Sequence, residues 1–507
     1  MNTVKSVRLN ASANMLGIAY SSFISIIILP FYLEYLGAEA FGLVGFFIML
    51  QAWMQLLDMG MSPMLSRQTS SVRGESGGKP DAFVELKKIL RSLELIIFSL
   101  SLSIILGIAC TSSWVAKNWL TVVSLDLNSV SFSIVLMGII SGITFFSSLY
   151  KSGIRGMEEQ VKLNITTVIF ISLKFIGSFL LLRFVTQDIV SFFLYQFSIV
   201  LLEAITLCFI FYHCMPATER IGINFFWSSL KPLLPFAGGV AYTAGIWVLL
   251  TQMDKLILSK VLPLSEYGYF ALVVTVATGI TQISTPISQA ILPRMTYLLS
   301  QGREQDMLIL YRRATQYMAI LTFPVAGMIA FFARDVLFVW TGNQAAAEWA
   351  GPILTWFALG NGILTMSAFQ YYLQFAHGDL KMHVIYYTIS ASIQIPLIIY
   401  IAFNFGAIGV AMVWCILRAV SFILWTPIVH RKFAPGIHRH WILKDIFPVF
   451  FSTAIVLFLF YGLNFDFEGM SRVRLLVFFA GIGSSLLVIN TLVSDAGRNF
   501  LFAALKK

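Results

Sequence analysis

The stretch from Pro30 to Arg67, PFYLEYLGAEAFGLVGFFIMLQAWMQLLDMGMSPMLSR, places an apolar run between two turn signals. The first signal combines Leu36-Gly37 with Phe41-Gly42-Leu43, and the second is Asp58-Met59-Gly60. Glycine-containing turns interrupt helices, and about 20 apolar residues are enough for a helix to cross a hydrocarbon core. The stretch therefore predicts a helical hairpin in a membrane.

A weaker copy of this stretch occurs later in the chain. There Ser265-Glu266-Tyr267-Gly268-Tyr269 precedes an apolar run that ends at Pro293-Arg294. A second echo pairs Leu86-Lys87-Lys88 with Tyr311-Arg312-Arg313, each at the start of an apolar run. Repeats that share their orientation predict two parallel halves, related by an axis along the membrane normal.

The composition excludes a soluble globular protein. Of the 507 residues, 58% are hydrophobic and only 11% are charged, which leaves too little polar surface for a soluble fold. The net charge of +10 comes from Lys and Arg that lie mostly in alternate loops, among them Lys151 and Arg155. Such a bias orients membrane proteins with their basic loops inside, so both termini are predicted to be cytoplasmic.

Hydropathy and turn signals predict an all-α polytopic membrane protein of about fourteen transmembrane helices. The expected spans begin near residues 10, 41, 92, 129, 164, 190, 233, 267, 315, 349, 383, 407, 446 and 472. The repeat divides them into two parallel six-helix lobes and two further helices. The predicted parts are an N-lobe at 1–214, a cytoplasmic linker at 215–232, a C-lobe at 233–430, and a C-terminal pair with a basic tail at 431–507.

Three charges fall near the middle of predicted spans: Lys174, Glu203 and Arg418. A charge at that depth costs about 2.5 to 3.5 kcal/mol on insertion scales, so each needs a partner or a role. Lys174 and Glu203 lie on successive spans and have two interpretations, a structural ion pair or cavity charges. Arg418 has no evident acidic partner in its half, which favours a place in a substrate cavity.

Polar residues also follow one face of the first span, at Asn10, Asn14, Gly17, Ser21 and Ser25. Their spacing of three and four residues places them on one side of a helix. Small and polar residues favour close helix packing in membranes, but they also suit the wall of a hydrated cavity. Both interpretations stay open.

Further charges lie nearer the predicted span ends. Asp58, Asp254 and Lys255 can cap helices or reach the interface, and each is also a candidate for coupling or gating, as is Glu203. The basic residues at the inner face are mainly topological and are also candidates for capture of a phosphorylated lipid headgroup. These headgroup candidates are Arg67, Lys87, Lys88, Arg312 and Arg313.

Enzyme signatures are missing from the sequence. It contains no glycine-rich phosphate loop, no nucleophile elbow and no metal-ligand cluster of His and Glu. Its four cysteines form no CxxC pair. We therefore expect no catalytic residue, no metal and no cofactor.

The chain resembles the O-antigen flippases of the Wzx type, in the polysaccharide-transport branch of the multidrug/oligosaccharidyl-lipid/polysaccharide (MOP) exporter superfamily. The resemblance covers nearly the whole chain through the twelfth span. The residues that carry it are Asn14, Pro30, Leu36-Gly37, Phe41-Gly42-Leu43, Leu57-Asp58-Met59-Gly60, Asp254-Lys255-Leu256-Ile257-Leu258 and Glu266-Tyr267-Gly268-Tyr269-Phe270.

The resemblance implies two lobes around a cavity that opens alternately to each side of a bacterial inner membrane. The implied cargo is an undecaprenyl-diphosphate-linked oligosaccharide, moved from the cytoplasmic to the periplasmic leaflet for lipopolysaccharide biosynthesis. Coupling to a proton or sodium gradient is implied as well. Together with the residue pattern, this predicts Arg418 and Lys174 as diphosphate ligands and Asn14 and Ser21 as part of the sugar-facing wall.

Alternatives remain within and outside the superfamily. A multidrug antiporter or a lipid II flippase shares the architecture, although the antiporters usually carry acids in mid-membrane, where Glu203 is the one candidate here. A polysaccharide polymerase is disfavoured because the longest predicted outer loops are short and each has a single basic residue. A polymerase and chain-length proteins are instead expected as partners, beside membrane lipids, and no nucleic acid is.

Overall fold

The computed structural model describes residues 2–75, 80–216, 222, 224–463 and 470–505. Over these residues the secondary structure is helical, and the pairing of Thr121 with Pro263 is an isolated bridge rather than a strand. This confirms the predicted all-α fold. Twelve of the described helices are long and apolar enough to cross a membrane.

Two of these twelve helices are interrupted by glycines with positive φ. Helix α1 (Asn2–Met54) breaks at Gly37, where φ is 78°, and α15 (Lys381–Phe433) breaks at Gly406, where φ is 60°. Glycine adopts this conformation without the steric cost that other residues incur. These breaks fall between the spans that are predicted to begin near residues 10 and 41 and near residues 383 and 407, and the total of fourteen stays a prediction.

The chain divides into two compact units, at residues 1–268 and 269–507. The boundary falls within α10 (Leu264–Gln282). The predicted lobe boundaries stay a prediction, and residues 217–221 and 223 of the predicted linker lie outside the described residues.

The first unit contains the helices up to the beginning of α10. After α1, in order, these are α2 (Met61–Glu75), α3 (Pro80–Trp114), α4 (Leu127–Gly156), α5 (Gln160–Ser172), α6 (Ser178–Phe184), α7 (Ile189–Cys214), α8 (Trp227–Leu230) and α9 (Leu234–Val261). Short 3-10 turns at Gln55–Asp58 and Lys231–Leu233 precede α2 and α9, and π-helical turns occupy Val115–Trp119 and Leu173–Gly177.

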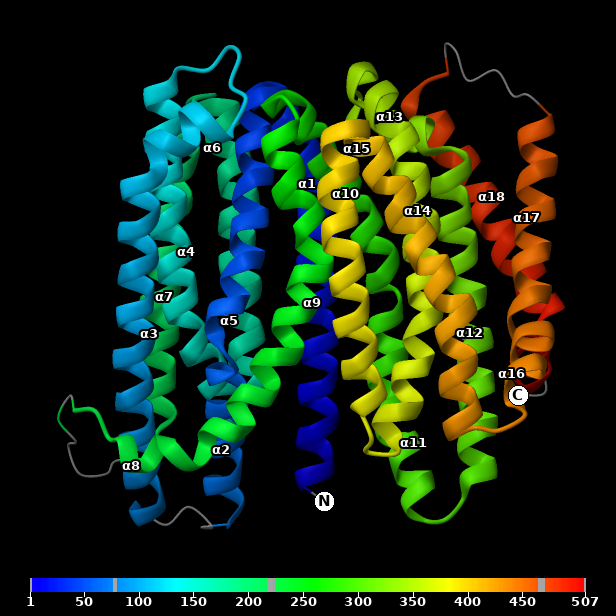
Figure 1. The fold of residues 1–507 in the computed structure, drawn as a ribbon, viewed down its shortest axis with the longest axis horizontal. Coiled ribbons are helices and arrows are strands. Elements are labelled where there is room, and N and C mark those ends of the chain that lie inside the picture. Colours follow the sequence, from blue (N-terminus) through cyan, green and yellow to red (C-terminus); the bar gives the residue numbers. More distant parts are fainter. Residues whose placement is uncertain (1, 76–79, 217–221, 223, 464–469, 506–507) are drawn as a thin grey trace. The chain divides into compact units, whose positions relative to one another are not determined.

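Helix α4 packs against both α3 and α7 in the first unit, and Figure 1 shows the three helices side by side. Their shared core includes Leu149, Ile154 and Phe211, which are fully buried. Large apolar side chains on three facing helices exclude lipid and water from the contact, so these helices form a rigid frame for the charges that they carry.

The second unit contains the remainder of α10 and nine further helices. They are α11 (Ser284–Ser300), α12 (Glu304–Phe331), α13 (Ala333–Thr341), α14 (Gln344–Ala376), α15, α16 (Ile437–His440), α17 (Phe447–Gly462), α18 (Arg472–Val493) and α19 (Asp495–Leu505). A π-helical turn at Trp441–Ile446 joins α16 to α17. In this unit α14 packs between α12 and α15.

A buried polar cluster attaches the C-terminal helices to α12. Asp445 in the π-helical turn is 0% exposed and accepts hydrogen bonds from Arg312 (2.7 and 3.0 Å) and from Gln316 (2.6 Å). The amide oxygen of Gln316 accepts from Ser494 and from the backbone of Ala496, each at 2.7 Å. One turn of α12 therefore holds segments on both sides of the α17–α18 pair.

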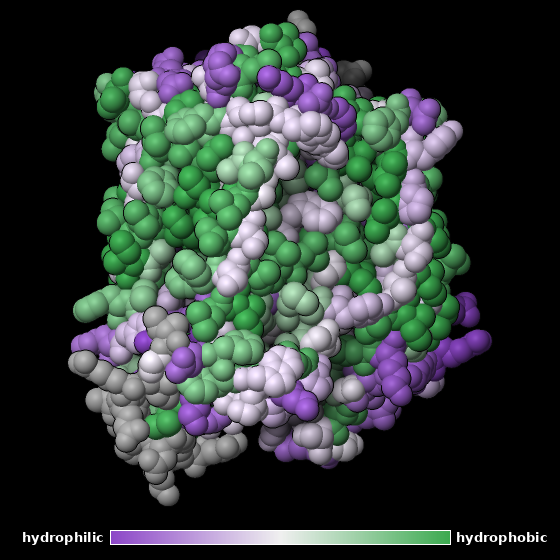
Figure 2. Space-filling view, turned by 60° about the vertical axis from the view of Figure 1, so that its left-hand side comes forward, coloured by the Kyte–Doolittle hydropathy of each residue, from purple (hydrophilic) through white to green (hydrophobic). Residues whose placement is uncertain are grey.

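The exposed surface has the polarity expected of a membrane protein. Figure 2 shows apolar side chains over the middle of the visible face and hydrophilic ones gathered toward its two ends. An apolar belt between polar rims is what a hydrocarbon layer between two aqueous phases requires.

Candidate functional site

Two lysines share one buried carboxylate in the first unit. Glu203 of α7 is 5% exposed. Its Oε2 accepts from Lys174 Nζ at 2.5 Å and its Oε1 accepts from Lys151 Nζ at 2.7 Å. The structure thus brings together Lys174 and Glu203, and adds Lys151 from α4. With all three groups ionised the cluster carries one excess positive charge.

A π-helical turn positions Lys174. This turn, Leu173–Gly177, interrupts the regular helix and leaves the carbonyl of Lys174 accessible to the amide of Gln196, at 3.2 Å. The hydroxyl of Tyr32 donates to the next carbonyl, that of Phe175, at 3.0 Å. Side chains from α1 and α7 therefore add hydrogen bonds to two carbonyls that the backbone N–H of Ser178 also reaches.

Arg418 of α15 is the buried charge of the second unit that has no acidic partner among the described residues. Its side chain is 3% exposed, and neither Nε nor Nη2 has a hydrogen-bond partner within the described part of the chain. The guanidinium carbon lies 5.0 Å from the centroid of the Trp414 ring. An unpaired donor in an apolar interior carries its full desolvation cost, so this guanidinium is suited to receive an anionic ligand.

The predicted gating residues on α9 lie next to each other. Asp254 is 1% exposed, and its Oδ1 accepts from Lys255 Nζ at 3.1 Å. Lys255 also donates to the carbonyl of Thr251, one turn earlier. The buried carboxylate is thus neutralised by its own neighbour in the chain.

Asp58 has a structural partner at the start of α2. Its carboxylate accepts from the backbone amide of Ser62 (3.2 Å) and from the Ser62 hydroxyl (2.5 Å). A carboxylate that accepts from the first amides of a helix acts as a cap. This geometry agrees with the capping interpretation of Asp58; a role in coupling stays a prediction.

Of the two polar candidates of the first span, Asn14 and Ser21, the structure describes the side chain of Ser21. The side chain of Asn14 lies outside the described residues. Ser21 is partly buried and its hydroxyl donates to the carbonyl of Gly17 at 2.7 Å, within its own helix. This donation occupies its proton and leaves the oxygen lone pairs for another donor.

The predicted headgroup residues are not equivalent. Arg312 is held by Asp445, Lys88 lies 3.2 Å from Glu85, and Arg67 stacks 4.6 Å from the centroid of the Phe236 ring. Arg313 is exposed, and Lys87 is partly buried. Of these five, Arg67 and Arg313 are exposed, whereas Arg312 is bound to the fold.

Lys151 is the functional candidate that sequence reasoning missed. The sequence pattern assigns it to an inner loop, but α4 continues to Gly156 and keeps Lys151 within the bundle. The sequence signal for a buried position was the neighbouring aromatic residue Tyr150. Its ring is buried where α4 packs against Phe211 of α7. A lysine that follows a buried aromatic residue in a helix is close enough to the core to reach an acid there.

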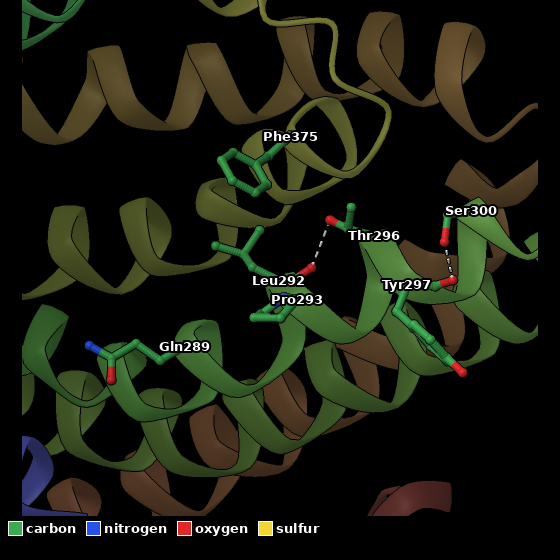
Figure 3. Close-up of a pocket in the computed structure, with 7 residues that line it drawn as sticks. All are labelled: Gln289, Leu292, Pro293, Thr296, Tyr297, Ser300 and Phe375. Carbon is green, nitrogen blue, oxygen red and sulfur yellow. Dashed lines mark hydrogen bonds between the residues drawn. The ribbon is translucent and has the colours of Figure 1, made fainter. Parts of the chain in front are cut away.

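A pocket of about 640 Å³ lies on the second unit between α11 and Phe375 of α14 (Figure 3). The hydroxyls of Thr296 and Ser300 donate to backbone carbonyls of α11 at 3.0 and 2.8 Å. Few polar groups are thus left to orient a ligand, and none of the predicted site residues lines this pocket. The residues that line it are Gln289, Leu292, Pro293, Thr296, Tyr297, Ser300 and Phe375.

Two units built from long apolar helices with buried charges define a polytopic membrane protein. The family model described as polysaccharide biosynthesis protein matches residues 7–299, more than half of the chain. The chain therefore belongs to the polysaccharide biosynthesis protein family. A comparison with curated proteins gives no match.

Solved structures with the same fold are transporters. The lipid II flippase MurJ, in an inward closed conformation, has a TM-score of 0.69 at 15% identity, with 98% of this chain and 100% of that chain covered. The MATE multidrug transporter DinF-BH has a TM-score of 0.59 at 15% identity, covering 84% and 95%. A MOP superfamily transporter from Pyrococcus furiosus has a TM-score of 0.53 at 14% identity, covering 84% and 95%. These similarities show the MOP superfamily fold.

Proposed function

We propose that this protein is a flippase of the Wzx type, which moves an undecaprenyl-diphosphate-linked oligosaccharide, such as an O-antigen unit, from the cytoplasmic to the periplasmic leaflet of a bacterial inner membrane. Arg418 is the observation that carries this proposal. A buried guanidinium without an acid needs an anion, and a lipid-linked diphosphate brings one to that depth while its isoprenoid tail stays in lipid.

The chemistry of the guanidinium suits this cargo. Its planar array of donors matches two oxygens of a phosphate, whereas an ammonium ion offers a point charge. A neutral drug would gain little from such a group, and a cationic drug would be repelled. The unpaired arginine thus favours a diphosphate carrier over a multidrug antiporter.

The other predicted residues take subsidiary roles in this proposal. Lys174 supplies positive charge near the cargo through the cluster with Glu203, and Asn14 and Ser21 contribute to the sugar-facing wall. Asp58, Glu203, Asp254 and Lys255 are the candidates for coupling to a proton or sodium gradient during alternating access. The exposed basic residues of the inner face attract the headgroup before transport.

The first test replaces Arg418 with glutamine in cells that depend on this protein for surface polysaccharide. We expect Arg418→Gln to abolish surface polysaccharide and to accumulate the lipid-linked intermediate on the cytoplasmic side, while Arg418→Lys retains part of the activity. Arg431→Gln, an exposed arginine at the end of the same helix, is the matched control. Normal transport in Arg418→Gln, at wild-type protein levels, would refute the role of this residue.

Transport of lipid II is the second candidate. The likeness to MurJ extends over 98% of this chain and therefore includes the C-terminal helices α17 and α18. Depletion of the protein separates the two cargoes, because loss of a lipid II flippase stops cell-wall synthesis and kills the cell. Loss of surface polysaccharide in viable cells would support the oligosaccharide cargo.

A further inference from the structure

A stripe of four side chains runs along one face of the second half of α15. Its members are Trp414, Arg418, Ser421 and Trp425, spaced by four, three and four residues. This spacing places them above one another on a helix. The opposite face of the helix carries the exposed apolar residues Ile416 and Ile423, so the stripe points away from the lipid.

The first half of α15 lies opposite the Ser421 and Trp425 end of the stripe, whereas the Trp414 ring packs against Phe357 of α14, 5.4 Å between centroids. The Ser421 hydroxyl donates to the Tyr386 hydroxyl at 2.5 Å, and the rings of Tyr386 and Trp425 lie 5.4 Å apart, inclined by 32°. The ring of Tyr387 follows at 5.5 Å from that of Tyr386. Aromatic faces and hydroxyls from both halves of one helical hairpin thus line the stripe.

Two members of the stripe have buried donors without acceptors among the described residues. These donors are the indole Nε1 of Trp425 and the Nε and Nη2 of Arg418. Seven residues separate the two side chains, which corresponds to about 10 Å along a helix. Unpaired donors are costly in an apolar interior, and two of them on one face indicate a single ligand with two acceptor groups.

The two donors differ in the acceptor that each prefers. The guanidinium favours a phosphate, as argued above, whereas the indole N–H is a neutral donor beside inclined aromatic faces. A sugar ring combines hydroxyl acceptors with apolar C–H faces, and it therefore matches the Trp425 end. A spacing of about 10 Å suits a phosphate and the sugar that is linked to it.

We propose that this stripe is a subsite for the sugar next to the diphosphate, with Arg418 on the phosphate and Trp425, Ser421 and Tyr386 on the sugar. This inference rests on the proposed function and adds the residues that recognise the sugar. Access to the stripe requires the halves of α15 to part, and Gly406 between them and Pro396 in the first half are the flexible points.

The test measures binding of two probes to the purified full-length protein in detergent. One probe is undecaprenyl diphosphate, which has no sugar, and the other is the lipid-linked oligosaccharide that accumulates in cells lacking this protein. We expect the wild type to bind the glycosylated probe more tightly. Trp425→Phe keeps an aromatic ring but removes the N–H, so it should bind the sugarless probe normally and the glycosylated probe about five-fold more weakly.

The exposed Trp114 provides the matched control, because Trp114→Phe should bind both probes as the wild type does. Tyr386→Phe is a second variant of the subsite, for use if Trp425→Phe fails to fold. It should weaken binding of the glycosylated probe and leave binding of the sugarless probe unchanged. Equal binding of both probes by the wild type would overturn the sugar subsite. Wild-type binding by Trp425→Phe, as expected if water satisfies the indole, would overturn it as well.

Different results would contradict the proposed flippase function itself. If no lipid-linked oligosaccharide accumulates in cells lacking the protein, or if Arg418→Gln binds both probes normally, the proposed function fails. If Arg418→Gln loses both probes while Trp425→Phe changes neither, the diphosphate site stands and the sugar subsite is wrong.

Discussion

The buried charges of this protein differ in whether the fold supplies a partner. Glu203 accepts from two lysines, and Asp254 is paired with the lysine that follows it. The guanidinium of Arg418 instead keeps two unpaired nitrogen atoms within the described part of the chain. The paired charges offset each other's burial, whereas the burial of Arg418 is not offset by an acid among the described residues.

The Lys151–Glu203–Lys174 cluster makes a stability prediction. Glu203→Ala leaves two ammonium groups next to each other in a buried site, which should lower the free energy of unfolding by about 3 kcal/mol. Thermal unfolding of the purified protein measures this effect. Glu34→Ala, which removes an exposed carboxylate of α1, should leave the midpoint within the error of the wild type.

A Glu203→Ala variant with the midpoint of the wild type would contradict the prediction, because it would show that lipid or water already screens the lysines. The double variant Lys151→Met with Glu203→Gln should recover part of the loss. It removes one of the two cations and keeps an acceptor for the other.

At the scale of the elements, the two copies of the opening motif meet within the first unit. A Cβ at Gly42 would overlap the backbone carbonyl of Leu264, and a Cβ at Gly268 would lie 2.6 Å from the carbonyl oxygen of Ala38. Helix α1 and the start of α10 therefore approach through their backbones. Small residues are used in this way where membrane helices pack closely.

This contact predicts that both glycines are required for packing. Gly42→Ala and Gly268→Ala should each destabilise the protein by about 1–3 kcal/mol through overpacking. Gly107→Ala in α3 is the control, since no atom lies within 4 Å of its added methyl group and alanine favours a helix. Equal midpoints for Gly42→Ala and Gly107→Ala in thermal unfolding would show that α1 and α10 separate easily.

Two of the π-helical turns carry charged residues that form buried contacts. One of them carries Lys174 and another carries Asp445. Hydropathy does not reveal such turns, because the added residue leaves the apolar run unchanged. The structure shows them in the backbone, at Leu173–Gly177 and Trp441–Ile446.

For the whole molecule, the distribution of basic residues predicts which loops face the cytoplasm. In a variant without the four native cysteines, Asn128→Cys at the start of α4 should react with a membrane-impermeant thiol reagent from the periplasmic side. Arg303→Cys, at the turn between α11 and α12, should react only after the inner membrane is permeabilised. Both side chains are exposed in the structure. The reverse labelling pattern would invert the predicted topology.

Hydropathy and turn signals were enough to predict the all-α membrane fold. This is because the bilayer imposes a length and a polarity on each span that can be recognised locally. The turn at Gly37 could be anticipated from the sequence, since glycine tolerates the conformation that the break requires.

Tertiary structure alone decided which charges are paired. Arg312 meets Asp445 across 133 residues of sequence, and Lys151 joins Glu203 only because α4 packs against α7. Pairing depends on how helices turn about their own axes and against each other, and hydropathy carries no signal for that rotation. The same packing leaves Arg418 and Trp425 without acceptors among the described residues, on one face of α15. The sequence therefore determined the membrane fold, and the packing of the helices decided which of its charges are paired.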